Sequence, residues 1–375
     1  MLLVTDLQRG GTPLRIARLA SGLREAGVDV CVGCLAPRGP VSEALERAGV
    51  PTFACEAKHP RDFGALFRLA DYVRRFRPDL IHATLTHANV AARLVGLYLR
   101  IPVITSTATI EVERRWHRWA ERLTGRLDHG HIVNSNTLAE HVARTFRLPR
   151  GRIHVVPPSI ELPPCCDQRT QVRATLGLAA QEFVVLWAGR FDPVKRLDLV
   201  IQCAEALRDV PARFLLAGDG PERPRIEQLL TRSSAAGTVH LLGWRDDLDV
   251  LMAAADAFLL PSRTEGMPNA VLQAMAAGLP VVASDTPTLR ELAGGGERIC
   301  LVPRDQPKAF ADALLALRAE PQRAAELGQR AAAWAREHLN PRETVAATLR
   351  VYRSVLSARC RAAQPASGRA PHTDR

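Results

Sequence analysis

Several features are missing from this 375-residue chain, and each absence excludes a class of protein. No run of about 18 apolar residues occurs, so no segment is predicted to span a membrane. The opening residues, MLLVTDL, are too short and too uncharged to predict a signal peptide. No G-x-G-x-x-G follows the first apolar run, which argues against a dinucleotide-dependent dehydrogenase. We therefore expect a protein that remains in the cytosol.

The eight cysteines lack the spacing of a metal site. Cys31 and Cys34 form a lone C-x-x-C inside an apolar run, and Cys165 is adjacent to Cys166. Neither pair has a second cluster that would complete a zinc site, so we expect reduced, structural thiols.

The formal net charge is +11, and arginine supplies most of it. The basic residues are scattered, without the aromatic motifs of RNA-binding sheets or a helix-turn-helix pattern, so no nucleic-acid partner is predicted. An anionic membrane surface or a phosphorylated substrate is a better match for this charge.

The length predicts two α/β domains, because about 150 residues is a common domain size and each half is large enough to bury its own core. The most informative stretch runs from 256 to 285 and reads DAFLLPSRTEGMPNAVLQAMAAGLPVVASD. An apolar strand ends at Pro261, a polar loop follows, a helix starts near Asn269 and stops at Gly278, and a second apolar strand comes next. Such a βαβ unit directs its loop and helix N-terminus into the crevice where open α/β sheets bind ligands, and a phosphate is favoured there.

This stretch resembles the donor-binding signature of the GT-B retaining glycosyltransferases of family 4, also called glycosyl transferases group 1. Their pattern is roughly S-x-x-E-G-x-P-N-x-x-x-E-A-M-A-x-G-x-P-V-V. The matching residues are Ser262, Glu265, Gly266, Pro268, Asn269, Ala274, Met275, Ala276, Gly278, Pro280, Val281 and Val282. The second glutamate of the pattern is replaced by Gln273. An ordinary βαβ unit explains the apolar runs but does not explain the SRTEGMPN loop.

The resemblance implies a GT-B fold, in which two Rossmann-like domains face each other across a cleft and a C-terminal helix returns to the first domain. We expect an acceptor-side domain over 1–163, a nucleotide-sugar domain over 164–340, a returning helix over 341–360 and a disordered tail over 361–375. The implied reaction moves a sugar from a UDP- or GDP-sugar to a glycan or lipid-linked acceptor with retention. It needs no protein nucleophile, no metal and no cofactor beyond the nucleotide-diphosphate sugar as co-substrate.

A second family motif, G-R-x-x-x-x-K, matches Gly189, Arg190 and Lys195 after a predicted strand over 183–188. In the family this motif grips the diphosphate. Cleavage of the glycosyl bond develops negative charge on the leaving diphosphate, so fixed cations beside it favour the transition state. We therefore predict Arg190 and Lys195 as catalytic residues, with Glu265 orienting the donor sugar.

The other predicted donor contacts follow from the same signature. Gly266 and Met267 are expected to offer backbone N–H groups, and Asn269 lies at the helix start. Gln273 takes the place of the acid that usually binds ribose hydroxyls. A neutral amide accepts a weaker hydrogen bond than a carboxylate, so weaker donor binding is expected.

The first-domain predictions are Gly10, Gly11 and His87. The glycine pair follows the first strand and resembles the family turn that borders the cleft, although a plain tight turn explains it equally well. His82 and His87 resemble the family's P-D-x-x-H-x-H segment with the second histidine displaced; His87 is either on the acceptor side of the cleft or a structural histidine. Two further departures from the family are Ala108, where relatives have a titratable group, and Pro158, where they have a glycine-containing hinge.

The segment 111–128 predicts a helix on which Trp116, Trp119, Leu123 and Leu127 share one face flanked by arginines. Two interpretations compete. The aromatic face packs on the sheet with the arginines in solvent, or the helix lies on an anionic membrane, on the inner face of which the protein would be peripheral.

Two other functions remain open beside glycosyl transfer. A GT-B sugar-nucleotide epimerase would keep the cleft without an acceptor, although the SRTEGMPN loop argues against it. A catalytically impaired sugar-nucleotide-binding subunit is favoured by Ala108, Pro158 and Gln273. The sequence does not specify the sugar, the base, the acceptor or the linkage.

Overall fold

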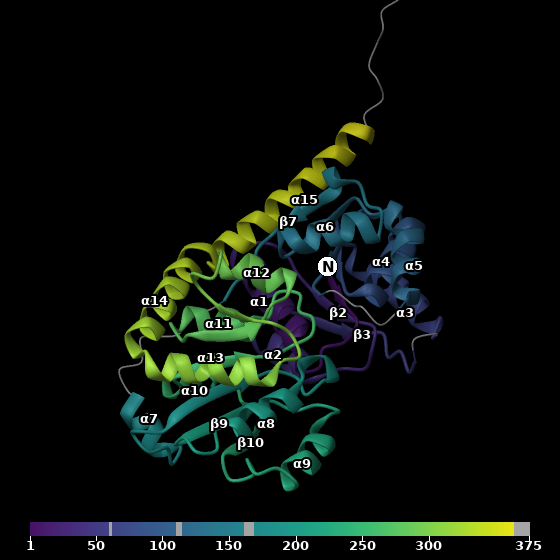
Figure 1. Cartoon of the computed structure of the whole chain (residues 1–375). Coiled ribbons are helices and arrows are strands. Elements are labelled where there is room, and N and C mark those ends of the chain that lie inside the picture. The colour runs from purple at the N-terminus through teal and green to yellow at the C-terminus, as the bar shows by residue number, and fades with distance from the viewer. Residues whose placement is uncertain (60–61, 110–114, 161–168, 364–375) are drawn as a thin grey trace, which may run out of the picture.

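Apolar runs bounded by glycine or proline form the strands of this chain, and the computed structural model arranges them in two parallel sheets covered by helices (Figure 1). Strands that are apolar along their whole length are typical of parallel sheets buried on both faces. The structure describes residues 1–59, 62–109, 115–160 and 169–363. The predicted pair of doubly wound domains is confirmed.

The first sheet has seven strands in the order β3-β2-β1-β4-β5-β6-β7. Its direction of winding reverses between β1 and β4, and a crevice beyond the carboxyl ends of the strands is expected at such a point. The strands are β1 Leu2–Val4, β2 Val32–Cys34, β3 Thr52–Ala54, β4 Ile81–Thr84, β5 Val103–Thr107, β6 Gly130–Val133 and β7 Ile153–Val155.

The second sheet has six strands in the order β10-β9-β8-β11-β12-β13. Its reversal lies between β8 and β11, which pair directly, so the loops that follow these two strands leave the sheet side by side. The strands are β8 Phe183–Ala188, β9 Ala212–Ala217, β10 Val239–Gly243, β11 Ala257–Leu260, β12 Val281–Ser284 and β13 Cys300–Val302.

Helices cover both faces of the first sheet. Ile16 of α1 and Leu45 of α2 pack in one core with Leu2, whereas Leu69 of α3 and Val95 of α4 belong to a second core on the opposite face. These helices are α1 Gly11–Glu25, α2 Pro40–Arg47, α3 Gly64–Phe76, α4 Thr86–Leu99, α5 Arg115–Thr124 and α6 Asn136–Thr145, with 3-10 turns at Gly125–Leu127 and Arg150–Arg152.

The second sheet has one large core, in which the fully buried Trp187, Phe214 and Phe258 lie on neighbouring strands. Its helices are α7 Arg169–Thr175, α8 Leu197–Ala206, α9 Arg223–Thr231, α10 Leu248–Ala254, α11 Asn269–Ala276, α12 Pro287–Ala293, α13 Pro307–Ala319 and α14 Pro321–His338, with a 3-10 turn at Pro193–Lys195.

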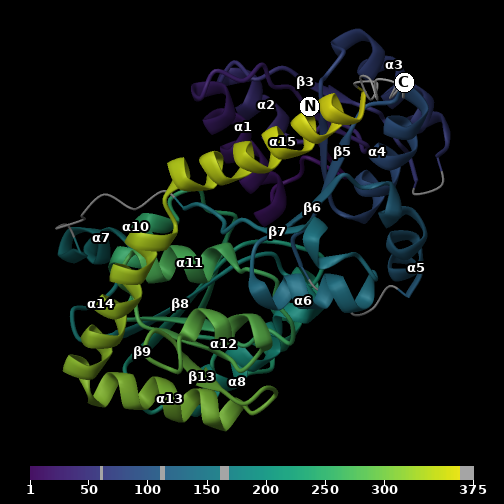
Figure 2. The ribbon, with the colours of Figure 1, turned by 90° about the horizontal axis from the view of Figure 1, so that it is seen from above.

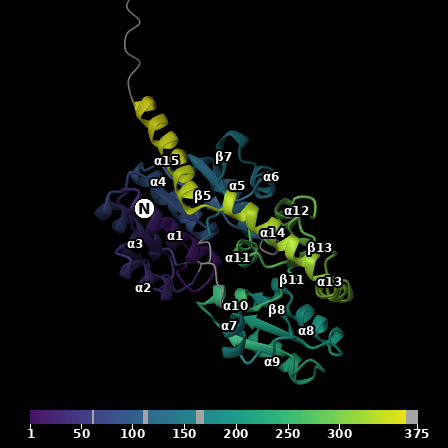
Figure 3. The same cartoon turned by 90° about the vertical axis from the view of Figure 1, so that its left-hand side faces the viewer.

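The last helix, α15 (Pro341–Ala363), leaves the second domain and lies along α1 of the first (Figures 2 and 3). The two helices approach so closely at Gly22 that a Cβ there would lie 2.6 Å from Cγ2 of Val345. The chain therefore crosses between the domains twice, near Pro157 and again near Leu339. The predicted linker around Pro163 and Pro164, Cys165, Cys166 and the tail from 364 lie outside the described residues.

Helix α5 presents its aromatic face to solvent. Trp116, Trp119 and Leu123 are 49%, 62% and 76% exposed, whereas His117 and Glu121 are the buried residues of the helix. The interpretation that docks the tryptophan face on the sheet is therefore wrong. Arg114, one of the arginines predicted to flank this face, lies outside the described residues.

A buried ion-pair network explains this orientation. Arg93 on α4 is fully buried and donates to Asp128 through Nε and Nη2, both at 2.7 Å, and to Glu121 through Nη1 at 2.6 Å. Burial alone would raise the pKa of Asp128, but hydrogen bonds from Arg93 and His131 hold it below its usual value. Because a buried guanidinium needs these carboxylates, Glu121 faces inward and the tryptophans face outward.

Among the described residues, no helix is both long enough and apolar enough to cross a membrane. Cys31, Cys34, Cys55, Cys203 and Cys300 are free thiols. Burial raises the pKa of Cys31 to about 11, which keeps this thiol protonated and unreactive.

Candidate active site

A cleft of about 510 Å³ separates the carboxyl ends of the two sheets. Its size is that of a small-molecule binding site, and both domains line it. The first domain contributes Gly10, Gly11, Leu14 and Arg18; the second contributes Gly189, Arg190, Lys195, Trp244, Arg245, Met252, Asn269 and Gln273, among others.

The turn after β8 carries both predicted cations. Gly189 packs against the turn after β9 so tightly that a Cβ on Gly218 would lie 1.8 Å from the Gly189 carbonyl oxygen. Phe191 is fully buried and its N–H donates to the Asp219 carbonyl at 2.9 Å. This anchoring holds Arg190 and Lys195 on the cleft wall, where Arg190 is exposed.

Lys195 and Glu265 meet although they are 70 residues apart. Lys195 Nζ donates to Glu265 Oε1 at 2.6 Å, and their side chains are 21% and 7% exposed. The carboxylate comes from the loop after β11, the neighbour of β8, which explains the contact. Arg190 and Lys195 line the cleft, and Glu265 is joined to it through its contact with Lys195. The catalytic roles of the three residues stay a prediction.

The helix α11 brings further predicted residues to the cleft. Asn269, its first residue, donates through Nδ2 to the Gly11 carbonyl of the other domain at 3.0 Å, and Gln273 lines the cleft one turn later. Gly266 lies against the first domain, since a Cβ there would be 2.0 Å from the Ala108 carbonyl oxygen. Met267 is partly buried and packs on the second-domain core.

Two cleft residues, Arg18 and Trp244, and the neighbouring Arg9 were not predicted from the sequence. The Arg9 guanidinium lies 5.7 Å from the ring centroid of Trp244, which joins the two domains across the cleft by a cation–π contact. Arg18 lines the cleft from α1, and its buried Nη1 has no hydrogen-bond partner among the residues that the structure describes. The sequence signal that could have identified Arg18 is its spacing from Leu14, which places both residues on one helical face after the glycine pair.

The two histidines of this segment have different surroundings, since His82 lies inside β4 and His87 lies in the first turn of α4. His82 is buried between the Tyr352 hydroxyl of α15, 2.6 Å from Nδ1, and the Ser106 hydroxyl, 2.5 Å from Nε2. Burial, with the positive charge of Arg15, lowers its pKa to about 3. His87 contacts the rings of Trp116 and His117 edge-on and is not among the residues that line the cleft.

In the described part of the chain, no three or more His, Cys, Asp or Glu side chains form a group that could hold a metal ion. Separately, Arg18, Arg190, Lys195 and Arg245 line the cleft and present positive charge to an anion there.

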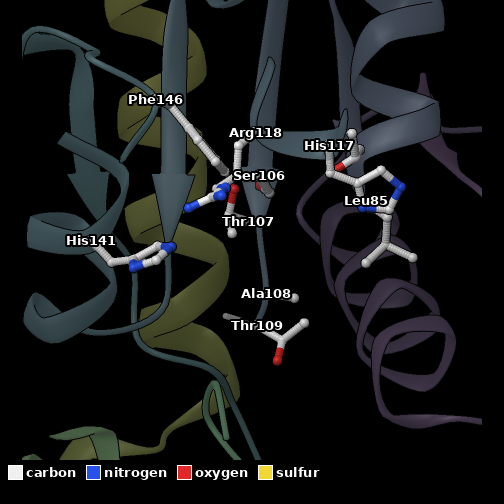
Figure 4. A pocket seen from close by; sticks show the side chains of 10 residues that line it. Leu85, Ser106, Thr107, Ala108, Thr109, His117, Arg118, His141 and Phe146 are labelled. Atoms are coloured by element: carbon white, nitrogen blue, oxygen red, sulfur yellow. The ribbon is translucent and has the colours of Figure 1, made fainter. Parts of the chain in front are cut away.

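A small cavity of about 20 Å³ lies at the end of β5 (Figure 4). Ala108, whose carbonyl oxygen faces Gly266, is one of the residues that line it. Thr107, Ala108 and Thr109 line it, with His117 of α5 and His141 of α6 on opposite sides and the Arg118 side chain between them. Burial, together with the Arg118 charge, lowers the pKa of His141. Two imidazoles and a guanidinium thus lie near the strand end where Ala108 departs from the family pattern.

Known glycosyltransferases match most of this chain. A family model described as Glycosyl transferases group 1 matches residues 182–320, and one described as Glycosyltransferase Family 4 matches residues 9–162. The chain is 26% identical over 270 residues to a UDP-Gal:alpha-D-GlcNAc-diphosphoundecaprenol alpha-1,3-galactosyltransferase of Escherichia coli, which covers 66% of this chain and 69% of the relative. It is 27% identical over 339 residues to a 2-deoxystreptamine N-acetyl-D-glucosaminyltransferase of Streptomyces fradiae, with 80% of each chain covered.

Solved structures share the fold over nearly the whole chain. Anabaena HepE in complex with UDP-glucose superposes with a TM-score of 0.82 at 21% identity, covering 95% of this chain and 99% of that one. Sucrose-phosphate synthase from Thermosynechococcus elongatus superposes with a TM-score of 0.80 at 22% identity and the same coverage.

Proposed function

The chain belongs to the GT-B glycosyltransferases of family 4, glycosyl transferases group 1, and from this membership we propose that it moves a sugar from a UDP- or GDP-sugar to a glycan or lipid-linked acceptor with retention of configuration. Anabaena HepE was solved with UDP and with UDP-glucose, which supports a nucleotide-sugar donor. The E. coli relative is named for an acceptor on diphosphoundecaprenol, which supports the lipid-linked class.

One observation carries the proposal: the 2.6 Å contact between Glu265 and Lys195, a residue that lines the cleft together with Arg190. An ammonium has three N–H donors, so Lys195 can hold Glu265 and a phosphate oxygen together. An exposed guanidinium beside it can grip a second phosphate oxygen in bidentate fashion. A diphosphate bound there places its sugar toward the loop of Glu265.

The proposed reaction uses these charges at the leaving group. The acceptor oxygen attacks the anomeric carbon from the face that the diphosphate leaves, the bond from that carbon to the diphosphate oxygen breaks, and its electron pair stays on the diphosphate. The departing oxygen takes the proton of the acceptor hydroxyl. Arg190 and Lys195 stabilise the charge that develops, and removal of one such group typically costs roughly 100-fold or more in rate.

The first test is a thermal-shift screen of UDP-, GDP- and ADP-sugars followed by measurement of donor hydrolysis. We expect at least one donor to stabilise the protein, turnover to persist in EDTA, and Arg190→Met to abolish it. The anomeric configuration of the transferred sugar, read by proton NMR, decides retention. Tight binding without turnover toward any acceptor would instead favour the impaired sugar-nucleotide-binding subunit that Gln273 and Ala108 suggest.

We further propose that the first domain rests on an anionic membrane through the outer surface of α3, α4 and α5. These three helices pack side by side on one part of the domain (Figures 1 and 2). Seven of the ten large apolar side chains that are exposed in the described residues lie on these helices, and an eighth, Phe63, directly precedes α3. The seven are Phe67, Leu94, Leu97, Tyr98, Trp116, Trp119 and Leu123. An exposed apolar patch of this kind marks an interaction surface.

Cations surround this patch. Arg115 and Arg118 are exposed on α5, and Arg74 lies over the Tyr98 ring at 5.3 Å. Aromatic rings at the headgroup level with arginines beside them match an anionic bilayer, where each interfacial Arg contributes about 1 kcal/mol. The proposal includes a peripheral position on the inner face of the membrane and a role in cell-surface polysaccharide or glycolipid synthesis.

Sedimentation with liposomes tests the membrane contact. Trp116→Ala with Trp119→Ala, or Arg115→Glu with Arg118→Glu, should abolish sedimentation with vesicles of phosphatidylglycerol and phosphatidylcholine while leaving the melting temperature unchanged. Leu229→Ser, an exposed apolar site on α9 of the other domain, is the matched control and should sediment like the parent protein. Sedimentation of both double variants at the parent level would exclude this surface.

A further inference from the structure

Helix α12 joins the predicted donor-sugar loop to its own domain. Thr288 in its first turn is buried, and its hydroxyl donates to the Glu265 carbonyl oxygen at 3.1 Å. The position of the Glu265 backbone is therefore tied to the position of this helix. The helix begins at Pro287. Its N-terminus is capped by the Thr286 hydroxyl, which accepts from the Leu289 N–H at 3.4 Å.

The next turn of the same helix reaches the other domain. The Glu291 carboxylate accepts from the backbone N–H groups of Asn136 and Thr137, both at 2.8 Å, and from Asn136 Nδ2 at 3.2 Å. These N–H groups belong to the first turn of α6, where backbone donors lack helical partners and the helix dipole favours a negative charge. A side chain of the second domain thus caps a helix of the first.

A second path leads back to the donor loop. Asn134, two residues before α6, donates through Nδ2 to the Ala108 carbonyl at 3.3 Å. The same carbonyl oxygen faces Gly266, where a Cβ would lie 2.0 Å from it. The contacts therefore link the two domains in a closed ring of interactions. The Glu265–Gly266 loop takes part at two points, the hydrogen bond from Thr288 to the Glu265 carbonyl and the packing of Gly266 on the Ala108 carbonyl.

We propose that Glu291 is a positioning residue that keeps the cleft closed and thereby fixes the Glu265 loop for the donor. When the domains separate, Glu291 loses its three donors and Gly266 loses its support on Ala108. Donor binding and domain closure are then coupled. The apparent affinity for a ligand rises with the fraction of the protein that is already closed. The identity of the ligand rests on the proposed function, but the closure itself does not.

Three variants of the full-length protein test the role of this residue. Glu291→Ala removes the cap, and Glu291→Gln keeps an acceptor oxygen but loses the charge. Arg290→Ala is the matched control, because Arg290 is the adjacent residue of the same helix and pairs with Asp285 inside its own domain at 2.7 Å.

Small-angle scattering of the ligand-free proteins measures closure directly. We expect Glu291→Ala to have a larger radius of gyration than the parent protein, Glu291→Gln an intermediate value and Arg290→Ala an unchanged one. Calorimetric titration with UDP, GDP and ADP measures the coupling. The dissociation constant of whichever nucleotide binds should rise about tenfold in Glu291→Ala and about threefold in Glu291→Gln, with kcat at saturating donor changing less than KM.

An unchanged radius of gyration together with an unchanged nucleotide affinity in Glu291→Ala would overturn the proposal, as would equal effects of Arg290→Ala. If the parent protein bound none of the three nucleotides, the proposed donor would fail, and scattering from the ligand-free variants would still decide the role of Glu291. Melting temperatures of all variants confirm that each domain keeps its fold.

Discussion

Replacing Lys195 with Met would remove the ammonium group 2.6 Å from Oε1 of Glu265 and leave the carboxylate behind. Two unit charges about 3 Å apart at an effective dielectric constant near 20 attract by roughly 5 kcal/mol, and desolvation of the pair offsets part of that. The carboxylate is 7% exposed and cannot regain full hydration, whereas the lysine is partly solvated. We therefore expect Lys195→Met to lower the free energy of unfolding of the second domain by about 2–3 kcal/mol, just below the range of about 3–5 kcal/mol for fully buried pairs that are broken.

The double variant Lys195→Met/Glu265→Gln separates loss of the pair from loss of packing. Because it leaves no unpaired charge, it should recover at least about 1 kcal/mol of the loss, measured as the coupling energy of a double-mutant cycle in urea unfolding. Turnover of the donor should nevertheless fall by at least roughly 100-fold in Lys195→Met, in Glu265→Gln and in the double variant, since the charge beside the diphosphate or the sugar contact is gone.

Lys308→Met is the control, because Lys308 is exposed on α13, outside the cleft. It should match the parent protein in stability and turnover. A Lys195→Met protein with undiminished turnover would refute the catalytic role of the lysine. Additive single effects, with a coupling energy near zero, would refute the claim that the buried pair organises the site.

Three other outcomes follow from the structure. Glu121→Ala should lower the free energy of unfolding by about 3–5 kcal/mol, measured by urea unfolding, because it leaves the buried Arg93 short of a carboxylate; a change under about 1 kcal/mol would contradict the network. Burial holds the pKa of His82 near 3, below the 6.5 of the unfolded chain, so its contribution to stability is complete above pH 6.5 and is lost as the pH falls toward 3. At about 1.4 kcal/mol per pH unit, unfolding at pH 5 should cost about 2 kcal/mol less than at pH 7.5, and His82→Asn should flatten this dependence. Gln273→Glu should tighten donor binding in calorimetry, since a carboxylate is a stronger acceptor for ribose hydroxyls, and looser binding would contradict that assignment.

The strands and the second-domain loops could be predicted because their signals are local. The run Phe183–Ala188 is apolar throughout and ends at Gly189, and the structure gives β8 the same bounds. Likewise β11 ends at Leu260, before the loop that carries Glu265. Parallel strands present their carboxyl ends at one edge, so residues after neighbouring strands meet there.

The orientation of α5 could not be predicted, because it depends on a partner far away in the sequence. Trp116, Trp119 and Leu123 have the spacing of a buried helical face. Glu121 instead pairs with the buried Arg93 of another helix and therefore faces inward. No local sequence pattern predicts that pairing. The cross-domain contacts of Glu291 and Arg9 escaped the sequence for the same reason.

The two passages of the chain between the domains run side by side. The Ile160 N–H donates to the Leu339 carbonyl at 3.2 Å, and the Thr344 hydroxyl donates to the Pro157 carbonyl at 3.0 Å. Paired connections at one end of an interface allow rotation about the line that joins them and resist sliding or twisting. The two domains should therefore open by rotation about a hinge at Pro157 and Leu339. Sugar donor and acceptor would then enter the cleft on the side opposite this hinge.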